Sequence, residues 1–278
     1  MEILKPANLN ELLIAYASHP EAFLMAGGIE LMKMEETAPQ PKTIIDLTAV
    51  EDLKRISRTE RHMDIGPSLP FSHIMSIGRH VIPRILHDAL DSLLAPAIRN
   101  LATLGGNICQ ASPHSASLAA LVALEAQLEL RSVNSTRWIS AMKFIPAQGE
   151  TDLKEGEILT RIRIPLESWS VQIFRSSAES LVIFCGLANI LKGVIQDIRF
   201  SIGSVNPIVI RDRKLETPLI GHKIPLQDRE IGMVNSALSE MLVPIADSPS
   251  RRVYQIETSR RMIHWFLKNL NHLDQTVP

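Results

Sequence analysis

Residues 99–130 read RNLATLGGNICQASPHSASLAALVALEAQLEL, and the rest of the chain is organised around this stretch. Two adjacent glycines, Gly105 and Gly106, lead through small residues into an apolar helical run. No Asp or Glu occurs in residues 92–124, where Arg99 is the single Lys or Arg. A glycine-rich loop that lacks acidic residues and exposes its backbone N–H groups suits a phosphate. The stretch therefore predicts one half of a nucleotide-binding site.

A second glycine pair, Gly27 and Gly28, predicts the other half of that site. It ends an apolar run over residues 22–25, which we expect to be a buried strand. A helix is expected over 30–36 and a second strand over 43–47, so this segment predicts a small βαβ unit with parallel strands. The turn would then face the start of a helix, where anions bind readily. The alternative is a purely structural turn, because glycine pairs are common and no GxGxxG pattern is present.

The remaining periodicity predicts an α+β chain in two parts. In the first part we expect helices over 9–18, 70–77, 83–94 and 116–126, and strands over 127–130 and 157–165, the last of them half-exposed. After a boundary near residues 166–170, antiparallel strands are expected over 171–174, 181–191 and 194–202, followed by helices over 228–242 and 251–270. We expect domains at 1–167, with subdomains at about 1–55 and 56–167, and at 168–278. The second domain shows no catalytic constellation.

Composition excludes several classes of function. The 278 residues carry 29 basic and 30 acidic side chains, so no basic excess indicates a nucleic-acid partner. The N-terminus lacks the pattern of a signal peptide, and the apolar runs are too short for membrane insertion, so we expect a cytoplasmic protein. The two cysteines, Cys109 and Cys185, are too few for an iron–sulfur cluster or a structural zinc site. We expect both to be small buried residues and no metal site.

Four segments, in the same order, resemble the FAD-binding subunit of the molybdenum hydroxylases, the family of xanthine dehydrogenase and carbon monoxide dehydrogenase. That family carries AGGTDL, RNxxTIGGNIxxASPxxD, GEILTEIRIP and a GVAPxPVR-like segment. In this chain residues 26–31 read AGGIEL, residues 99–113 read RNLATLGGNICQASP, residues 156–165 read GEILTRIRIP and residues 203–211 read GSVNPIVIR. Each match alone is weak, but four in order over nearly the whole chain are specific.

The resemblance implies a fold and a function. FAD would lie between two N-terminal α+β subdomains, with its pyrophosphate on the backbone amides of both glycine pairs. Electrons would arrive from iron–sulfur clusters on a partner and leave to NAD or another acceptor, beside a molybdopterin subunit, with no catalytic acid or base on this chain. The implied cofactor-binding residues are Leu24, Met25, Ala26, Gly27, Gly28, Ile29, Glu30, Thr103, Leu104, Gly105, Gly106, Asn107, Ser112, Leu159 as an apolar contact, and Arg175 in the second domain.

Two departures from the family pattern keep other hypotheses open. Ile29 stands where the family has Thr, and Ala116 stands where it has Asp, so two side-chain hydrogen bonds to the cofactor are missing. The second hypothesis is therefore a scaffold subunit of the same fold that no longer binds FAD. The third is a free-standing FAD-linked oxidase, which the lack of a His or Cys in a flavin-attachment context disfavours.

Overall fold

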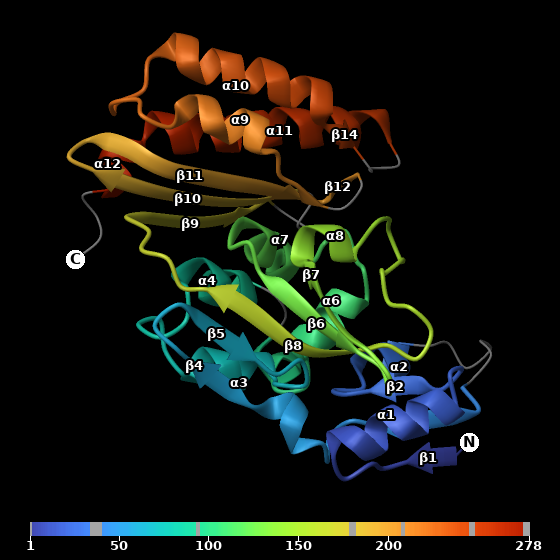
Figure 1. The fold of residues 1–278 in the computed structure, drawn as a ribbon. Helices are drawn as coiled ribbons and strands as arrows, with labels where there is room; N and C mark the ends of the chain where they lie inside the picture. The colour runs from blue at the N-terminus through green and yellow to red at the C-terminus, as the bar shows by residue number, and fades with distance from the viewer. Residues whose placement is uncertain are drawn as a thin grey trace.

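The computed structural model describes residues 2–33, 41–92, 95–177, 182–206, 209–244 and 248–274. The described strands form sheets of three, five, four and two strands. The three larger sheets follow one another along the molecule, from the N-terminal unit through the middle unit to the C-terminal unit (Figure 1). This arrangement confirms the predicted α+β class.

The N-terminal unit is a parallel three-stranded sheet. Its order is β1-β3-β2, made of β1 (Glu2–Leu4), β3 (Thr43–Asp46) and β2 (Phe23–Met25). Helix α1 (Leu9–Ser18) and helix α2 (Ile29–Lys33) connect the strands. The predicted βαβ unit is confirmed, and β1 was missed because three residues are too few to show a periodicity. The predicted end of the second helix, at residues 34–36, lies outside the described residues.

The middle unit is an antiparallel sheet in the order β4-β5-β8-β6-β7. A short 3₁₀ helix (Glu51–Lys54) leads into it. Its central strand β8 was expected to be half-exposed, and this is confirmed, because Ile162 and Ile164 are buried while Arg161 and Arg163 between them are partly exposed. The strands are β4 (Ile56–Arg58), β5 (His62–Ile65), β8 (Ile158–Pro165), β6 (Gln127–Arg131) and β7 (Thr136–Ser140).

Helix α7 (Ala116–Ala123) is completely buried in the middle of the structure. All eight of its residues are buried, and Ser115 caps it by accepting from the Leu118 amide, as predicted. It lies between the middle sheet and the C-terminal sheet (Figure 1), and Ser201 Oγ donates to its Ala119 carbonyl at 2.7 Å. The other helices of this unit are α3 (Phe71–Ser76), α4 (Arg84–Ser92), α5 (Pro96–Arg99), α6 (Leu104–Cys109) and α8 (Ala141–Phe144).

The C-terminal unit is an antiparallel sheet in the order β13-β11-β10-β9, which confirms the predicted antiparallel strands. Its strands are β9 (Val171–Ser176), β10 (Ile183–Leu191), β11 (Val194–Gly203) and β13 (Val209–Ile210). Helices α10 (Asp228–Met241) and α11 (Pro249–Lys268) cover its outer face (Figure 1). Smaller elements are α9 (Arg213–Glu216), a 3₁₀ helix (Thr217–Leu219), α12 (Leu270–Asp274) and the pair β12 (Val205–Asn206) and β14 (Val243–Pro244).

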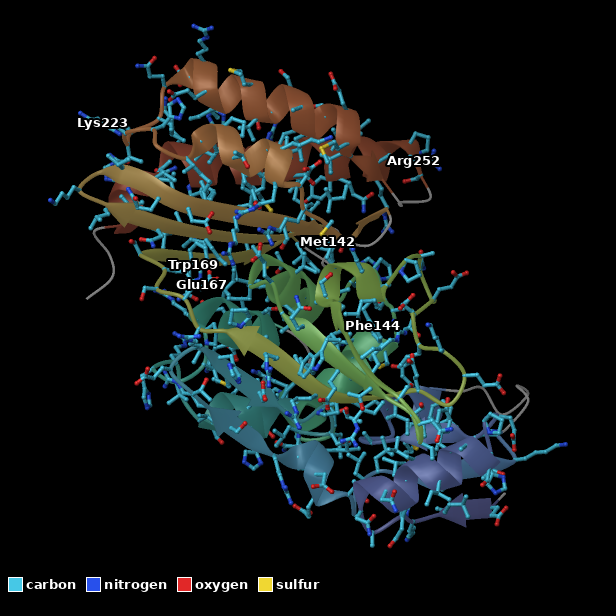
Figure 2. All side chains as sticks on the ribbon, in the orientation of Figure 1. Met142, Phe144, Glu167, Trp169, Lys223 and Arg252 are labelled. Carbon is cyan, nitrogen blue, oxygen red and sulfur yellow. The ribbon has the colours of Figure 1, made fainter. Side chains whose placement is uncertain are left out.

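Contacts with Arg199 hold the segment between β8 and β9 in place where the middle and C-terminal units meet. Glu167 and Trp169 lie at this junction (Figure 2). The buried Arg199 of β11 pairs with the Glu167 carboxylate at 2.7 Å and lies 4.6 Å from the centre of the Trp169 ring. The connection between the two units is therefore held by packing and charge together.

Candidate functional site

A cavity of about 360 Å³ lies between the N-terminal unit and the middle unit. It brings the two predicted glycine segments together, although more than seventy residues separate them in sequence. Its lining is mostly apolar, and its polar side chains are those of Glu30, Ser68, Thr103, Asn107 and Gln110. The lining residues are Phe23, Leu24, Met25, Ala26, Gly27, Gly28, Ile29, Glu30, Leu47, Pro67, Ser68, Leu101, Ala102, Thr103, Gly105, Gly106, Asn107, Cys109, Gln110, Leu153, Ile158 and Leu159.

The turn between β2 and α2 touches the segment before α6 directly. A β-carbon placed on Gly27 would meet the Leu101 carbonyl oxygen at 1.7 Å, so no other residue fits without moving the backbone. Gly28 has a φ of +73°, a left-handed conformation that other L-residues adopt only with strain. Gly27 is therefore required because a side chain would collide with the backbone of Leu101. Gly28 is required because its backbone conformation is left-handed.

The second glycine pair has a different role from the one expected. Gly105 and Gly106 were predicted to form a loop with exposed N–H groups, but both lie in the first turn of α6. The Gly105 amide donates to the Pro67 carbonyl at 2.8 Å, and the Gly106 amide donates to Thr103 Oγ1 at 3.2 Å. A β-carbon on Gly105 would stand 2.5 Å from Pro67 Cβ. These glycines therefore permit close packing, and their amides are already used.

Unused backbone donors remain on the first glycine turn. Within the described part of the chain, no hydrogen bond joins the amides of Gly27, Gly28 or Ile29 to another group. Three successive N–H groups that lack internal partners form the kind of concave donor set that binds anions. The unbonded amides of the two glycine segments are therefore those of the β2–α2 turn, whereas the amides of Gly105 and Gly106 already have partners.

The start of β8 supplies part of the apolar wall of the cavity. Ile158 and Leu159 both line the cavity, although Ile158 packs with the core of the N-terminal unit and Leu159 packs with the core of the middle unit. The pairing of β6 with β8 shifts register between Glu129 and Leu130, which leaves Thr160 as the extra residue of a bulge. The bulge follows the two wall residues and changes the face to which the side chains beyond Thr160 point.

Arg137 of β7 anchors the loop that carries Leu153, another wall residue. Its guanidinium bonds the Asp152 carboxylate at 2.7 Å and the Glu157 carboxylate at 2.7 Å through two nitrogens. Hydrogen bonding to Arg137 lowers the pKa of Glu157, and the Lys154 amide at 2.8 Å adds to the effect. Sequence reasoning missed this anchor, because the partners are spread over three segments with no regular spacing.

Cys109 is the one thiol in the cavity wall. Cys185 is buried as expected, whereas Cys109 is only half-buried, because it lies in the cavity wall. Burial raises the pKa of the Cys109 thiol to about 12. Cys109 is therefore a neutral thiol at physiological pH and is not a nucleophile, because the reactive form is the thiolate.

Most of the predicted cofactor-binding residues line the cavity, and three do not. Leu104 is fully buried in the core, because the first turn of α6 directs its side chain inward. Ser112 lies in the turn after α6, where its hydroxyl accepts from the His114 amide at 3.3 Å. Arg175 is exposed on β9, and its guanidinium lies 5.1 Å from the centre of the Trp265 ring. Ala116 is also outside the cavity, with 1% of its surface exposed.

Comparison with known proteins assigns the chain to a family. The family model described as "FAD binding domain in molybdopterin dehydrogenase" matches residues 1–167, and the chain belongs to this family. This confirms the resemblance seen in the motifs. None of the described helices is long and apolar enough to cross a membrane.

Individual relatives match over most of their length. The chain is 28% identical over 241 residues to the glyceraldehyde dehydrogenase medium chain of Sulfolobus acidocaldarius, a match that covers 84% of this chain and 85% of that protein. It is 23% identical over 274 residues to the xanthine dehydrogenase FAD-binding subunit of Escherichia coli O157:H7, with 93% of each covered. A chain of quinoline 2-oxidoreductase from Pseudomonas putida 86 has the same fold, with a TM-score of 0.88, 22% identity and coverage of 99% of this chain and 97% of that one.

Proposed function

We propose that this chain binds FAD in the cavity between its N-terminal and middle units and serves as the electron-transfer subunit of a molybdenum-containing hydroxylase or dehydrogenase. The observation that carries the proposal is the close approach of Gly27 to the Leu101 carbonyl, which brings the β2–α2 turn and its unbonded amides into the cavity wall. Family membership over residues 1–167 supports the identity of the cofactor.

The residues present fit a dinucleotide. The amides of Gly27, Gly28 and Ile29 would hold the pyrophosphate, because they lack other partners in the described chain and no positive side chain is needed beside them. Leu153, Ile158 and Leu159 would cover an aromatic ring of the cofactor and exclude water from it. Bound FAD supplies the one- and two-electron chemistry, so the chain itself has to position the cofactor and set its environment.

The two departures from the family pattern fall where the structure tolerates them. Ile29 removes a hydroxyl but keeps its backbone amide on the turn, and its side chain packs against the core. Ala116 is buried in α7 and is not part of the cavity wall. Neither change removes the donor set on the β2–α2 turn, which favours FAD binding over the scaffold hypothesis.

Under this proposal the iron–sulfur clusters and the molybdopterin are bound by other chains. Residues 1–167 would form the FAD-binding domain, with subdomains at about 1–55 and 56–167, and residues 168–278 a C-terminal domain that supports it. Two cysteines cannot hold a cluster, so iron–sulfur and molybdopterin subunits would be separate partners. Electrons would pass through the flavin to NAD or another acceptor. The free thiols of Cys109 and Cys185 are consistent with the reducing cytoplasm.

The test is direct addition of FAD to the purified full chain. We expect saturable binding near one equivalent, seen as a shift of the flavin absorbance and quenching of its fluorescence. Purification of the complex from its host should bring down iron and molybdenum with this chain. A chain that stays colourless with FAD, alone and with its co-purified partners, would overturn the proposal in favour of a scaffold.

A further inference from the structure

Two buried serines hold the side chain of Asn107, which lies in the cavity wall. Asn107 Oδ1 accepts from Ser115 Oγ at 2.8 Å and from Ser117 Oγ at 2.6 Å. Ser115 is 2% exposed and Ser117 is fully buried, so water does not compete for these hydroxyls. The serines stand at the start of α7, one on each side of Ala116, and Asn107 stands in α6.

The hydrogen count determines which way the Asn107 amide faces. Ser115 Oγ already accepts from the Leu118 amide at 3.3 Å as the cap of α7, which leaves its single proton for donation. Both serine protons find an acceptor only if Oδ1 faces them, since a carbonyl oxygen accepts two bonds. The reversed amide would leave one of the two buried protons without an acceptor among the described residues. A buried donor without an acceptor is strongly unfavourable, so the orientation is fixed.

The fixed orientation turns the Nδ2 group of Asn107 away from the serines. Nδ2 carries two N–H donors, and no described residue accepts from either. Nδ2 is not among the buried unpaired atoms of the described chain, so it is open to solvent or to a ligand. Since Asn107 lines the cavity, the cavity contains an oriented side-chain donor that is kept free of internal bonds.

We propose that Ser115 and Ser117 are positioning residues that hold Asn107 as a hydrogen-bond donor to an acceptor atom of the bound flavin nucleotide. This inference rests on the proposed function and deepens it. The hydroxyls on either side of Ala116 act through Asn107, without touching the cofactor themselves.

The decisive variant is Asn107→Asp, because it separates the donor from the structural role. An aspartate keeps an oxygen for both serine protons, but it presents a second oxygen to the cavity in place of the Nδ2 donors. We expect its FAD dissociation constant to rise about a hundredfold. The Nδ2 donor is lost, and the new carboxylate oxygen of residue 107 would repel the acceptor atom of the flavin nucleotide. Ser117→Ala should weaken FAD about tenfold in the wild-type background and have little effect in an Asn107→Ala background.

The matched control is Ser201→Ala, which removes another fully buried hydroxyl that bonds α7 but does not touch Asn107. It should lower the thermal midpoint of the free chain as Ser117→Ala does, yet leave FAD affinity unchanged. Wild-type affinity in Asn107→Asp, or an equal effect of Ser117→Ala in both backgrounds, would overturn the positioning role while leaving FAD binding intact. A wild-type chain that binds no FAD would overturn this inference together with the proposed function.

Discussion

The carbonyl oxygen of Leu101 lies 1.7 Å from the position that a β-carbon on Gly27 would occupy. This contact joins the N-terminal unit to the middle unit in the wall of the cavity. It involves backbone on the Leu101 side, so no change of side-chain conformation can relieve a clash there. The geometry of the cavity therefore depends on a residue that contributes no side chain.

Gly27→Ala should abolish FAD binding, because the added methyl group must push the β2–α2 turn away from Leu101 and displace the unpaired amides. Equilibrium dialysis with FAD measures the loss. Gly232→Ala is the control, since a β-carbon at that position of α10 meets nothing within 4 Å. In a helix interior that change should stabilise by about 0.5–1 kcal/mol. Wild-type FAD affinity in the Gly27 variant would contradict the proposed site.

Arg175→Ala should leave FAD affinity unchanged. The guanidinium stacks on Trp265, and Arg175 does not line the cavity. Loss of an exposed cation–π contact should lower the free energy of unfolding by about 0.5–1 kcal/mol. Fluorescence titration with FAD and chemical denaturation measure the two effects. A weakened FAD complex would show that Arg175 reaches the cofactor after all.

Arg137→Ala should destabilise the wall of the cavity. Glu157, which is 4% exposed, would keep a buried carboxylate without its ion partner. Since Arg137 itself is partly exposed, we expect a loss of about 2 kcal/mol in the free energy of unfolding. FAD affinity should fall as well, because the loop that carries Leu153 loses its anchor. Arg79→Ala, which breaks an exposed pair with Asp88, is the control and should cost less than about 1 kcal/mol.

The same anchor predicts a pH dependence of stability. The pKa of Glu157 is lowered in the folded chain by Arg137, so the folded state binds the carboxylate proton less readily than the unfolded state does. The stabilisation is therefore fully present above the unfolded value of about 4.3, and it is lost as pH falls through the lower folded pKa. Thermal melts from neutral to acid pH should fall less steeply for Arg137→Ala than for wild type. Parallel curves would contradict this assignment.

Cys109 should resist alkylation although it lines the cavity. A thiol pKa of about 12 leaves so little thiolate at neutral pH that iodoacetamide should react at least about a thousandfold more slowly than with a free cysteine. Intact-mass spectrometry over time measures the rate, and the same chain in denaturant is the control. Rapid labelling of Cys109 in the folded chain would show that the thiol is activated.

Local patterns in the sequence determined a large part of this protein. Capping residues and apolar periodicity predicted α1, α7, α10 and α11, and short β-rich runs predicted β2, β3 and the antiparallel strands of the C-terminal unit. The two glycine pairs marked both sides of the cavity, because adjacent glycines can be recognised directly in the sequence. The βαβ order was also sufficient to predict parallel pairing of β2 with β3.

Only the tertiary structure decided how those segments are used. Gly105 packs closely against Pro67, and the side chain of Leu104 is buried in the core. The side chain of Arg175 contacts the Trp265 ring instead of lining the cavity. The anchoring of the Leu153 loop by Arg137, and of Asn107 by two serines, likewise joins residues that no periodicity relates. Propensity and patterning act over a few residues, whereas hydrogen-bond partners and close backbone contacts depend on how distant segments pack. The sequence alone therefore located the cavity, and the packing selected the atoms that face it.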